Sequence, residues 1–413
     1  MSFSLKRGQR RLGPRAFFAC ILSIDLIAIL AIDMYAPALP SMQETFGVSI
    51  GYLNLTMFAF FFVSAFSTFL TGPLSDCCGR KPPLVLVTVL FAFSSAGCAL
   101  SPSVEFLVVF RVLQGASVGG VQTLATALIQ DAYAEDSVQT AMTFLQSLVI
   151  IGPVLAPFLG SFILMATSWR GVFAILALLG ALAVVLALLV SETHEVRGSH
   201  DAARAGVKES LHKVVRDCGA LASTRSFLSL ALIMGFAGVP FFAFIAAVPY
   251  ILMNHFGMDY LGYSMIYALT CLLDCIAPFI YLALSKRMPD QRILRMSFVL
   301  IGVSGVALLA VGEISPGVFF LAFAPYALSE GIIRPLAYVD LLNQPEDRVG
   351  SASSLVNFSY VIITAVATVV ATLDWPSLIV GLGVITLATF AIALVLYFWG
   401  QARHGEASRD ASL

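Results

Sequence analysis

The sequence predicts an all-α polytopic membrane protein in which twelve transmembrane helices form two pseudo-symmetric six-helix bundles. Of its 413 residues, 59% are hydrophobic, and the mean hydropathy is +0.93. Charged residues make up 11% of the chain, whereas an ordinary soluble domain contains roughly 25%. A soluble protein of this length needs far more polar surface, so we expect the chain to lie in a lipid bilayer. The net charge of −1 argues against nucleic acid as a partner.

Six apolar runs in the first half are each long enough to span the bilayer, which takes roughly 20 residues. Proline, glycine or charged residues separate them, for example at Pro40, Pro102 and Arg170. The first run is not expected to be a cleavable signal peptide, because it is long, contains acidic residues and lacks a small-residue cleavage site. The spans of this predicted first bundle, 16–190, lie near residues 16–38, 51–73, 83–101, 104–130, 138–166 and 171–190.

The one long connection, residues 191–226, falls near the midpoint of the chain and precedes a second bundle, 227–399. Its second half places apolar residues on one helical stripe, which predicts an amphipathic helix on the inner membrane surface; a regulatory partner site is the alternative. The stripe consists of Val207, Leu211, Val214, Val215, Cys218 and Leu221. The spans of the second bundle lie near residues 227–252, 261–284, 293–312, 316–341, 351–373 and 376–399.

Two short segments resemble each other at an offset of 211 residues: Glu135-Asp136-Ser137-Val138 and Glu346-Asp347-Arg348-Val349. Both join the fourth and fifth predicted helices of their half. A parallel repeat of six helices is typical of one large class of transporters. Together with the count of six and six helices, the match predicts two related halves.

The basic residues predict that both tails, residues 1–15 and 400–413, are cytoplasmic. If the helices alternate from an inner N-terminus, 20 of the 23 Lys and Arg residues fall on the cytoplasmic side, as the positive-inside rule requires. Arg170 then lies outside, while Arg111 and Arg334 lie within spans. We therefore expect a multi-pass protein of the inner (plasma) membrane.

Six charged side chains lie inside the predicted spans at more than two residues from either end, and each costs about 2.5–3.5 kcal/mol at the bilayer centre on translocon scales. Such residues usually face a water-filled cavity or one another, so a functional role is the default interpretation. The structural alternative is a buried ion pair that holds helices together. The six are Asp25, Asp33, Arg111, Asp274, Glu330 and Arg334.

Asp25 and Asp33 are the candidates for proton coupling. Eight residues separate them, which corresponds to about 12 Å of rise and 80° of rotation, so both can line one cavity at different depths. A buried carboxyl group can exchange a proton for a substrate as the cavity changes sides. Arg111 is the natural counter-charge, because a guanidinium keeps its proton, and Gln114 follows one turn later on roughly the same face.

In the second half, Glu330 and Arg334 have the i,i+4 spacing of a helical ion pair, and we expect them to pair with each other. Asp274 has no partner evident in the sequence. It either pairs with Arg334 or provides a second proton site.

No pattern in the sequence points to catalysis, a metal or a cofactor. The seven cysteines and five histidines lack the spacing of a zinc site, and we interpret the cysteines as free thiols. There is no nucleophile–base constellation, no output domain of a receptor and no Walker motif for ATP-driven transport. We therefore predict neither an enzyme nor a receptor.

Three segments resemble the signatures of a known family. Gly72-Pro-Leu-Ser-Asp76-Cys-Cys-Gly79-Arg80-Lys81-Pro82 looks like the signature G-x-L-x-D-R-x-G-R-K, and Arg111-Val-Leu-Gln-Gly115 resembles a second signature. A third segment resembles the antiporter motif through Gly152, Pro153, Ala156, Pro157 and Gly160. With the segment Asp33-Met-Tyr35-Ala-Pro-Ala-Leu-Pro40, they resemble the major facilitator superfamily. The narrower resemblance is to its twelve-helix drug:proton antiporters, of the bicyclomycin- and chloramphenicol-resistance and multidrug exporter type.

The resemblance implies a role for each motif. In multidrug exporters of this type, two acids eight residues apart in helix 1 handle protons and cationic drugs, which corresponds to Asp25 and Asp33. The helix 4 arginine corresponds to Arg111, and Tyr35 joins the candidate substrate site.

The loop motif implies a cytoplasmic gate in which Asp76 caps a second-half helix and Arg80 bridges to Asp131, beside Lys81. The glycines and prolines of helix 5 imply close packing and bending against a helix of the other half. Three residues depart from the family pattern: Cys77 replaces a basic residue, Ala156 replaces a common glycine, and Asp274 matches no motif.

Two functions follow from these expectations. The first is export of amphiphilic or lipophilic compounds in exchange for protons by alternating access. The alternative is a proton-coupled carrier for one specific metabolite, such as a siderophore or an organic acid. The 32 Phe, 12 Tyr and 12 Met residues favour lipophilic cations, although phenylalanines in spans more often face lipid or the core. We expect a monomer without a cofactor, whose partners are small molecules, protons and lipid.

Overall fold

The computed structural model describes residues 12–193, 215–342 and 349–401. Within these ranges, eleven helices are long and apolar enough to cross a membrane, or twelve when the two bent halves of α6 are counted as one span. Large apolar side chains are exposed on these helices, including Leu178 at 71%, Val395 at 68% and Leu86 at 65%. Such a surface suits lipid and not water. The predicted all-α polytopic fold is thus confirmed.

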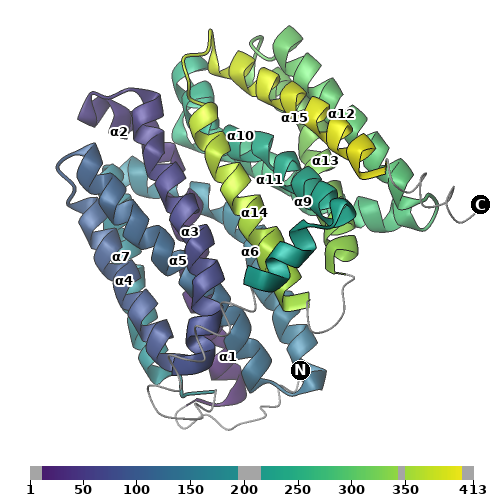
Figure 1. Ribbon diagram of the computed structural model, residues 1–413. Helices are drawn as coiled ribbons and strands as arrows, with labels where there is room; N and C mark the ends of the chain where they lie inside the picture. Colours follow the sequence, from purple (N-terminus) through teal and green to yellow (C-terminus); the bar gives the residue numbers. More distant parts are fainter. Residues whose placement is uncertain (1–11, 194–214, 343–348, 402–413) are drawn as a thin grey trace, which may run out of the picture. The chain divides into compact units, whose positions relative to one another are not determined.

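The chain divides into two compact units, of which the first contains residues 1–212 and 258–268. Within it, α3 packs along α5 and α4 packs along α7, while α1 contacts α5, α6 and α7 (Figure 1). Its helices are α1 (Pro14–Asp33), the 3₁₀ turn η1 (Ala36–Ala38), α2 (Leu39–Phe46), α3 (Ile50–Cys78), α4 (Lys81–Ala99), α5 (Val104–Ala132), α6 (Glu135–Ala166) and α7 (Trp169–Leu189).

The second unit contains residues 213–257 and 269–413. Here α12 packs against α13 and α15, as α4 packs against α5 and α7 in the first unit. Likewise, α10 packs against α14, as α1 packs against α6. This correspondence supports two related halves, although Glu346, Asp347 and Arg348 of the sequence repeat lie outside the described residues. The helices are α9 (Arg225–Ala237), α10 (Val239–Pro249), the π-helical turn η2 (Tyr250–His255), α11 (Tyr260–Ser285), α12 (Asp290–Val311), α13 (Pro316–Leu342), α14 (Val349–Val370) and α15 (Leu378–Gln401). The first part of α11, up to residue 268, belongs to the first unit.

Prolines break the helices at defined positions, because each lacks the N–H that would bond to the carbonyl four residues earlier. The first predicted span, 16–38, ends as an α-helix at Asp33, four residues before Pro37. The two halves of α6 meet at 41° next to residue 149, four residues before Pro153. The break after α1 places the buried carboxyl group of Asp33 at the end of the helix.

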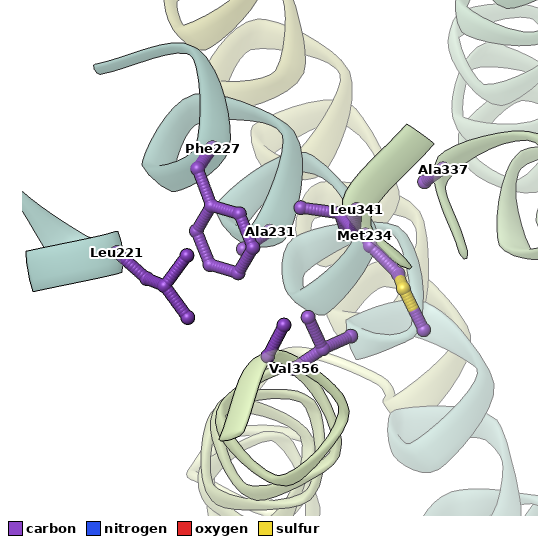
Figure 2. Packing of buried hydrophobic residues seen from close by; sticks show 8 residues of the cluster. Leu221, Phe227, Ala231, Met234, Ala337, Leu341 and Val356 are labelled. Carbon is purple, nitrogen blue, oxygen red and sulfur yellow. The ribbon is translucent and has the colours of Figure 1, made fainter. Parts of the chain in front are cut away.

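The connection between the halves is described only from residue 215, and residues 215–222 are helical. Val207, Leu211 and Val214 of the predicted amphipathic stripe lie outside the described residues. Leu221 is buried in an apolar cluster of the second unit and lies beside Phe227 of α9, whereas Val215 is 60% exposed (Figure 2). The cluster also contains Ala231, Met234, Ala337, Leu341, Ala352 and Val356. The placement of the whole helix on the membrane surface stays a prediction.

Candidate functional site

The two acids of α1 are both buried in the first unit. Asp25 and Asp33 are each 2% exposed. The Oδ1 atom of Asp25 has no hydrogen-bond partner within the described ranges. Asp33 is the last residue of α1, and Tyr267 at the start of α11 donates a hydrogen bond from its hydroxyl to Asp33 Oδ1 at 3.1 Å. Sequence reasoning missed Tyr267, since no motif marks it.

Arg111 is held by aromatic rings and neutral oxygens. Its guanidinium carbon lies 4.1 Å from the ring centroid of Tyr35 and 4.1 Å from that of Phe60, a geometry in which each ring face attracts the cation. Nη1 donates to Gln114 Oε1 at 2.6 Å and to the carbonyl of Ala31 at 3.3 Å. The predicted cation and amide are thus brought together beside Tyr35.

Arg111 forms no ion pair with Asp25 or Asp33 in the part of the chain that the structure describes. Arg111 was predicted to be the counter-charge of these acids. In the structure it acts on Asp33 only through long-range electrostatic attraction, without a direct contact. The two rings attract the cation through their faces, whereas its Nε and Nη2 atoms are buried without a hydrogen-bond partner among the described residues. Both acids remain available for protons.

Glycines determine how closely helices approach this site. A Cβ atom on Gly115 would lie 2.3 Å from the carbonyl oxygen of Phe60, so only glycine allows α5 to bring Arg111 over that ring. A Cβ atom on Gly160 would lie 1.9 Å from the carbonyl oxygen of Met34, next to Asp33.

The antiporter-motif helix α6 contacts both α1 and α11. Gly152 has its nearest neighbour in α1, at Ile29, and Gly160 has its nearest neighbour at Met34, the residue that follows α1. The following residue, Ser161, lies 2.8 Å from the hydroxyl of Ser264 in α11. Within the first unit, α6 thus contacts the start of α11 through Ser161, while Gly152 and Gly160 face the end of α1. Packing of the motif against the other half stays a prediction. Pro153 bends α6, and Pro157 follows one turn later.

The loop motif forms a charge cluster around Arg80, which is 7% exposed. Its Nη1 atom lies 2.6 Å from Asp76 Oδ1, and its Nε atom lies 2.8 Å from Asp131 Oδ2. Burial by itself lowers the pKa of Arg80, but the hydrogen bond to Asp131 and the charge of Asp76 raise it overall. Arg80 therefore stays charged and ties the ends of α3 and α5 together. Gly72 lies within α3, where a Cβ would meet Thr123 at an ordinary 3.8 Å.

Glu192 completes this cluster, and sequence reasoning missed it. Its carboxylate accepts hydrogen bonds from the backbone N–H groups of Arg80 at 2.8 Å and Lys81 at 3.0 Å. These groups start α4, so Glu192 caps the helix and complements its dipole. Gly79 has φ +88° and faces the same carboxylate, which explains the motif glycine. The one sequence signal was an acid just beyond α7.

The charges of the second unit form a separate group. Arg334 pairs with Glu330 as expected, and the hydroxyl of Tyr360 donates to Glu330 Oε1 at 3.1 Å. Asp274 Oδ1 is buried without a hydrogen-bond partner among the described residues. Across the part of the chain that the structure describes, no three or more His, Cys, Asp or Glu side chains form a group that could hold a metal ion.

The chain is similar to known proteins. The Major Facilitator Superfamily matches residues 21–368. The uncharacterized MFS-type transporter YdgK of Bacillus subtilis (strain 168) is 26% identical over 396 residues, which cover 95% of this chain and 96% of YdgK. The multidrug transporter MdfA of Edwardsiella ictaluri (strain 93-146) is 30% identical over 290 residues, which cover 70% of this chain and 69% of MdfA.

A solved structure has the same fold. It is a bacterial homolog of the human lysosomal transporter Spinster, in an inward-facing and unoccupied conformation, with a TM-score of 0.72 and 17% identity. The match covers 95% of this chain and 98% of the homolog. At this identity the likeness concerns the fold alone.

Proposed function

Because the chain belongs to the Major Facilitator Superfamily, we propose that it exports amphiphilic or lipophilic, often cationic, compounds in exchange for protons by alternating access. It is a multi-pass membrane transporter and not an enzyme. The name of the MdfA relative, a multidrug transporter, supports the substrate class. The distribution of basic residues supports cytoplasmic termini in the inner membrane, and we infer that a monomer carries out transport.

One observation carries this proposal: two buried carboxyl groups on α1, neither of which is in an ion pair with the nearby Arg111. A carboxylate buried without a cation is unfavourable by several kcal/mol, so such a group either binds a proton or receives a cationic ligand. Proton and cationic substrate therefore compete for Asp25 and Asp33. Because the two acids lie about 12 Å apart along α1, protons and substrate can be exchanged at two depths.

The Arg80 cluster supports a gate at the cytoplasmic end of the first unit. Asp76 is partly exposed, with 53% of its side chain accessible, and is tied to the buried Arg80 by one contact. The family resemblance implies that Asp76 caps a helix of the second half. Gating by this motif, with Asp131 as the fixed anchor of Arg80, is part of the proposal.

The test is substrate-induced proton release from purified protein near neutral pH. The wild-type protein should release protons when a lipophilic cation such as tetraphenylphosphonium is added, and an Asp25→Asn, Asp33→Asn double variant should release none. Amidation removes the proton sites and the negative charge while preserving side-chain size, so the fold should survive. Asp374→Asn, an exposed acid in the second unit, is the matched control and should behave like wild type.

The outcomes separate the alternatives. Undiminished release from a well-folded double variant would refute the assignment of the two acids. Expression in an efflux-deficient bacterium then addresses the substrate class. Resistance to several unrelated compounds is expected, whereas resistance to none would favour a carrier for one metabolite.

A further inference from the structure

The second unit contains a carboxyl pair for which the proposed transport mechanism provides no role. Glu330 of α13 is 2% exposed, and its two oxygens have different surroundings. Oε1 accepts hydrogen bonds from Arg334 and from the Tyr360 hydroxyl. Oε2 is buried and receives no hydrogen bond from any described donor.

Asp274 of α11 lies beside Gly331, the residue that follows Glu330 on α13. The two carboxyl groups are within hydrogen-bonding reach of each other, and Asp274 Oδ1 also lacks a donor among the residues described. The neighbouring Gly331 has no room for a side chain, because its Cβ would lie 2.7 Å from Asp274 Oδ1. Asp274 Oδ1 therefore lies at the contact between α11 and α13, next to the residue that follows Glu330.

Two carboxylates cannot hydrogen-bond to each other, because both are acceptors only. With both acids ionised, the pair would carry two negative charges against the single positive charge of Arg334. One proton resolves both problems, since a carboxylic acid donates to a carboxylate in a short, charge-assisted hydrogen bond. Because Glu330 already has two donors on Oε1, Glu330 is the carboxylate and Asp274 is the acid.

We propose that Asp274 and Glu330 form a proton-binding site in the second unit, in which Asp274 holds the proton and donates it to Glu330 Oε2. The proton comes from water. Its release would leave two adjacent carboxylates with one arginine, a state that a second cation would have to stabilise. The site is separate from Asp25 and Asp33 and does not depend on their role.

The neighbouring titratable groups leave Asp274 as the proton carrier. The hydroxyl of Tyr326 donates to the carbonyl of Ala237 at 2.6 Å, and that of Tyr360 donates to Glu330. Cys275, next to Asp274 on α11, and Arg334 complete the groups that interact with Asp274. The arginine keeps its proton, and a buried thiol is a much weaker acid than a carboxyl group.

The backbone around the pair contributes a second feature. Pro278 has no N–H for the carbonyl of Asp274, and Pro335 has none for the carbonyl of Gly331. A Cβ on Gly331 would also lie 2.6 Å from the Asp274 carbonyl oxygen. The two proline-opened turns therefore meet where the carboxyl groups meet, which gives both helices room to shift when the proton leaves.

The test is infrared difference spectroscopy of the purified protein without substrate at neutral pH. The wild type minus Asp274→Asn spectrum should contain the carbonyl stretch of one protonated carboxylic acid. Glu330→Gln should also remove this band, because its amide can donate to Asp274 and Arg334 then holds Asp274 ionised. Asp374→Asn should leave the band unchanged. Acid–base titration should show one proton fewer bound by each folded variant than by wild type.

Loss of a carboxylate band instead of an acid band in Asp274→Asn would overturn the proposal. The absence of the acid band from both difference spectra, wild type minus Asp274→Asn and wild type minus Glu330→Gln, would overturn it as well. Near-identical thermal unfolding of wild type and Glu330→Gln establishes that the comparison is between folded proteins. Because no substrate is added and Asp25 and Asp33 are intact, this result is independent of the drug-export experiment.

Discussion

Arg111 carries a permanent positive charge in a buried position of the first unit, where the rings of Tyr35 and Phe60 lie on it at equal centroid distances of 4.1 Å. A planar guanidinium can stack between two rings and still reach Gln114 with one N–H group, whereas an ammonium cannot do both. The arrangement spares Asp33 from a permanent ion pair. The chemistry of the site therefore depends on arginine and not only on positive charge.

Arg111→Lys should destabilise the protein by about 2 kcal/mol, the value of a desolvated cation–π contact, and should reduce proton-driven efflux. Thermal unfolding in detergent and efflux in everted vesicles provide the two measurements. Arg170→Lys is the matched control: Arg170 stacks on Trp169 at 4.1 Å but is exposed, so its loss should cost under about 1 kcal/mol. Equal effects of the two substitutions would contradict the interpretation.

The helices around the site depend on prolines that end or bend them and on glycines that bring them together. Pro37 ends α1 at Asp33, and Pro153 bends α6 where it passes α1. Gly160 then places the α6 backbone against the Met34 carbonyl. The motif of α6 thus shapes the surroundings of Asp33 within one unit.

Gly160→Ala should displace α6 from α1, because the added Cβ would lie 1.9 Å from the Met34 carbonyl oxygen. Overpacking of this kind costs about 1–3 kcal/mol, so the unfolding temperature should fall and transport should weaken. Gly317→Ala, which adds a Cβ with nothing within 4 Å, should leave both unchanged. Wild-type stability and transport in Gly160→Ala would show that α6 does not need this close approach.

The topology of the protein in the membrane follows from its charges, since 20 of 23 basic residues lie in segments assigned to the cytoplasm. A fluorescent reporter fused to the C-terminus should therefore be active, and alkaline phosphatase fused there should be inactive. The same two reporters inserted at Arg170, the one basic residue assigned to the outside, should give the opposite result. Phosphatase activity at the C-terminus would invert the topology and would require the gate to be reassigned.

Much of the candidate site could be anticipated from local sequence. Asp25, Asp33 and Arg111 stand out because charges in apolar spans are rare, and Arg80 and Asp131 are indicated by a signature. Tyr267, which hydrogen-bonds to Asp33, and Glu192, which hydrogen-bonds to Arg80, are marked by no charge in a span and by no signature. Tyr267 lies 234 positions from Asp33, and Glu192 lies 112 positions from Arg80, so neither contact follows from periodicity.

The all-α fold follows from the sequence alone, whereas the α-helical part of the first predicted span, 16–38, ends earlier, at Asp33. A spanning helix satisfies its own backbone hydrogen bonds, and its length, apolar character and prolines are properties of one continuous segment. The contact of Arg111 with two rings, and the position of Asp274 beside Gly331, could be seen only in the tertiary structure. These outcomes depend on which helix faces lie together, and close packing of distant segments sets that arrangement.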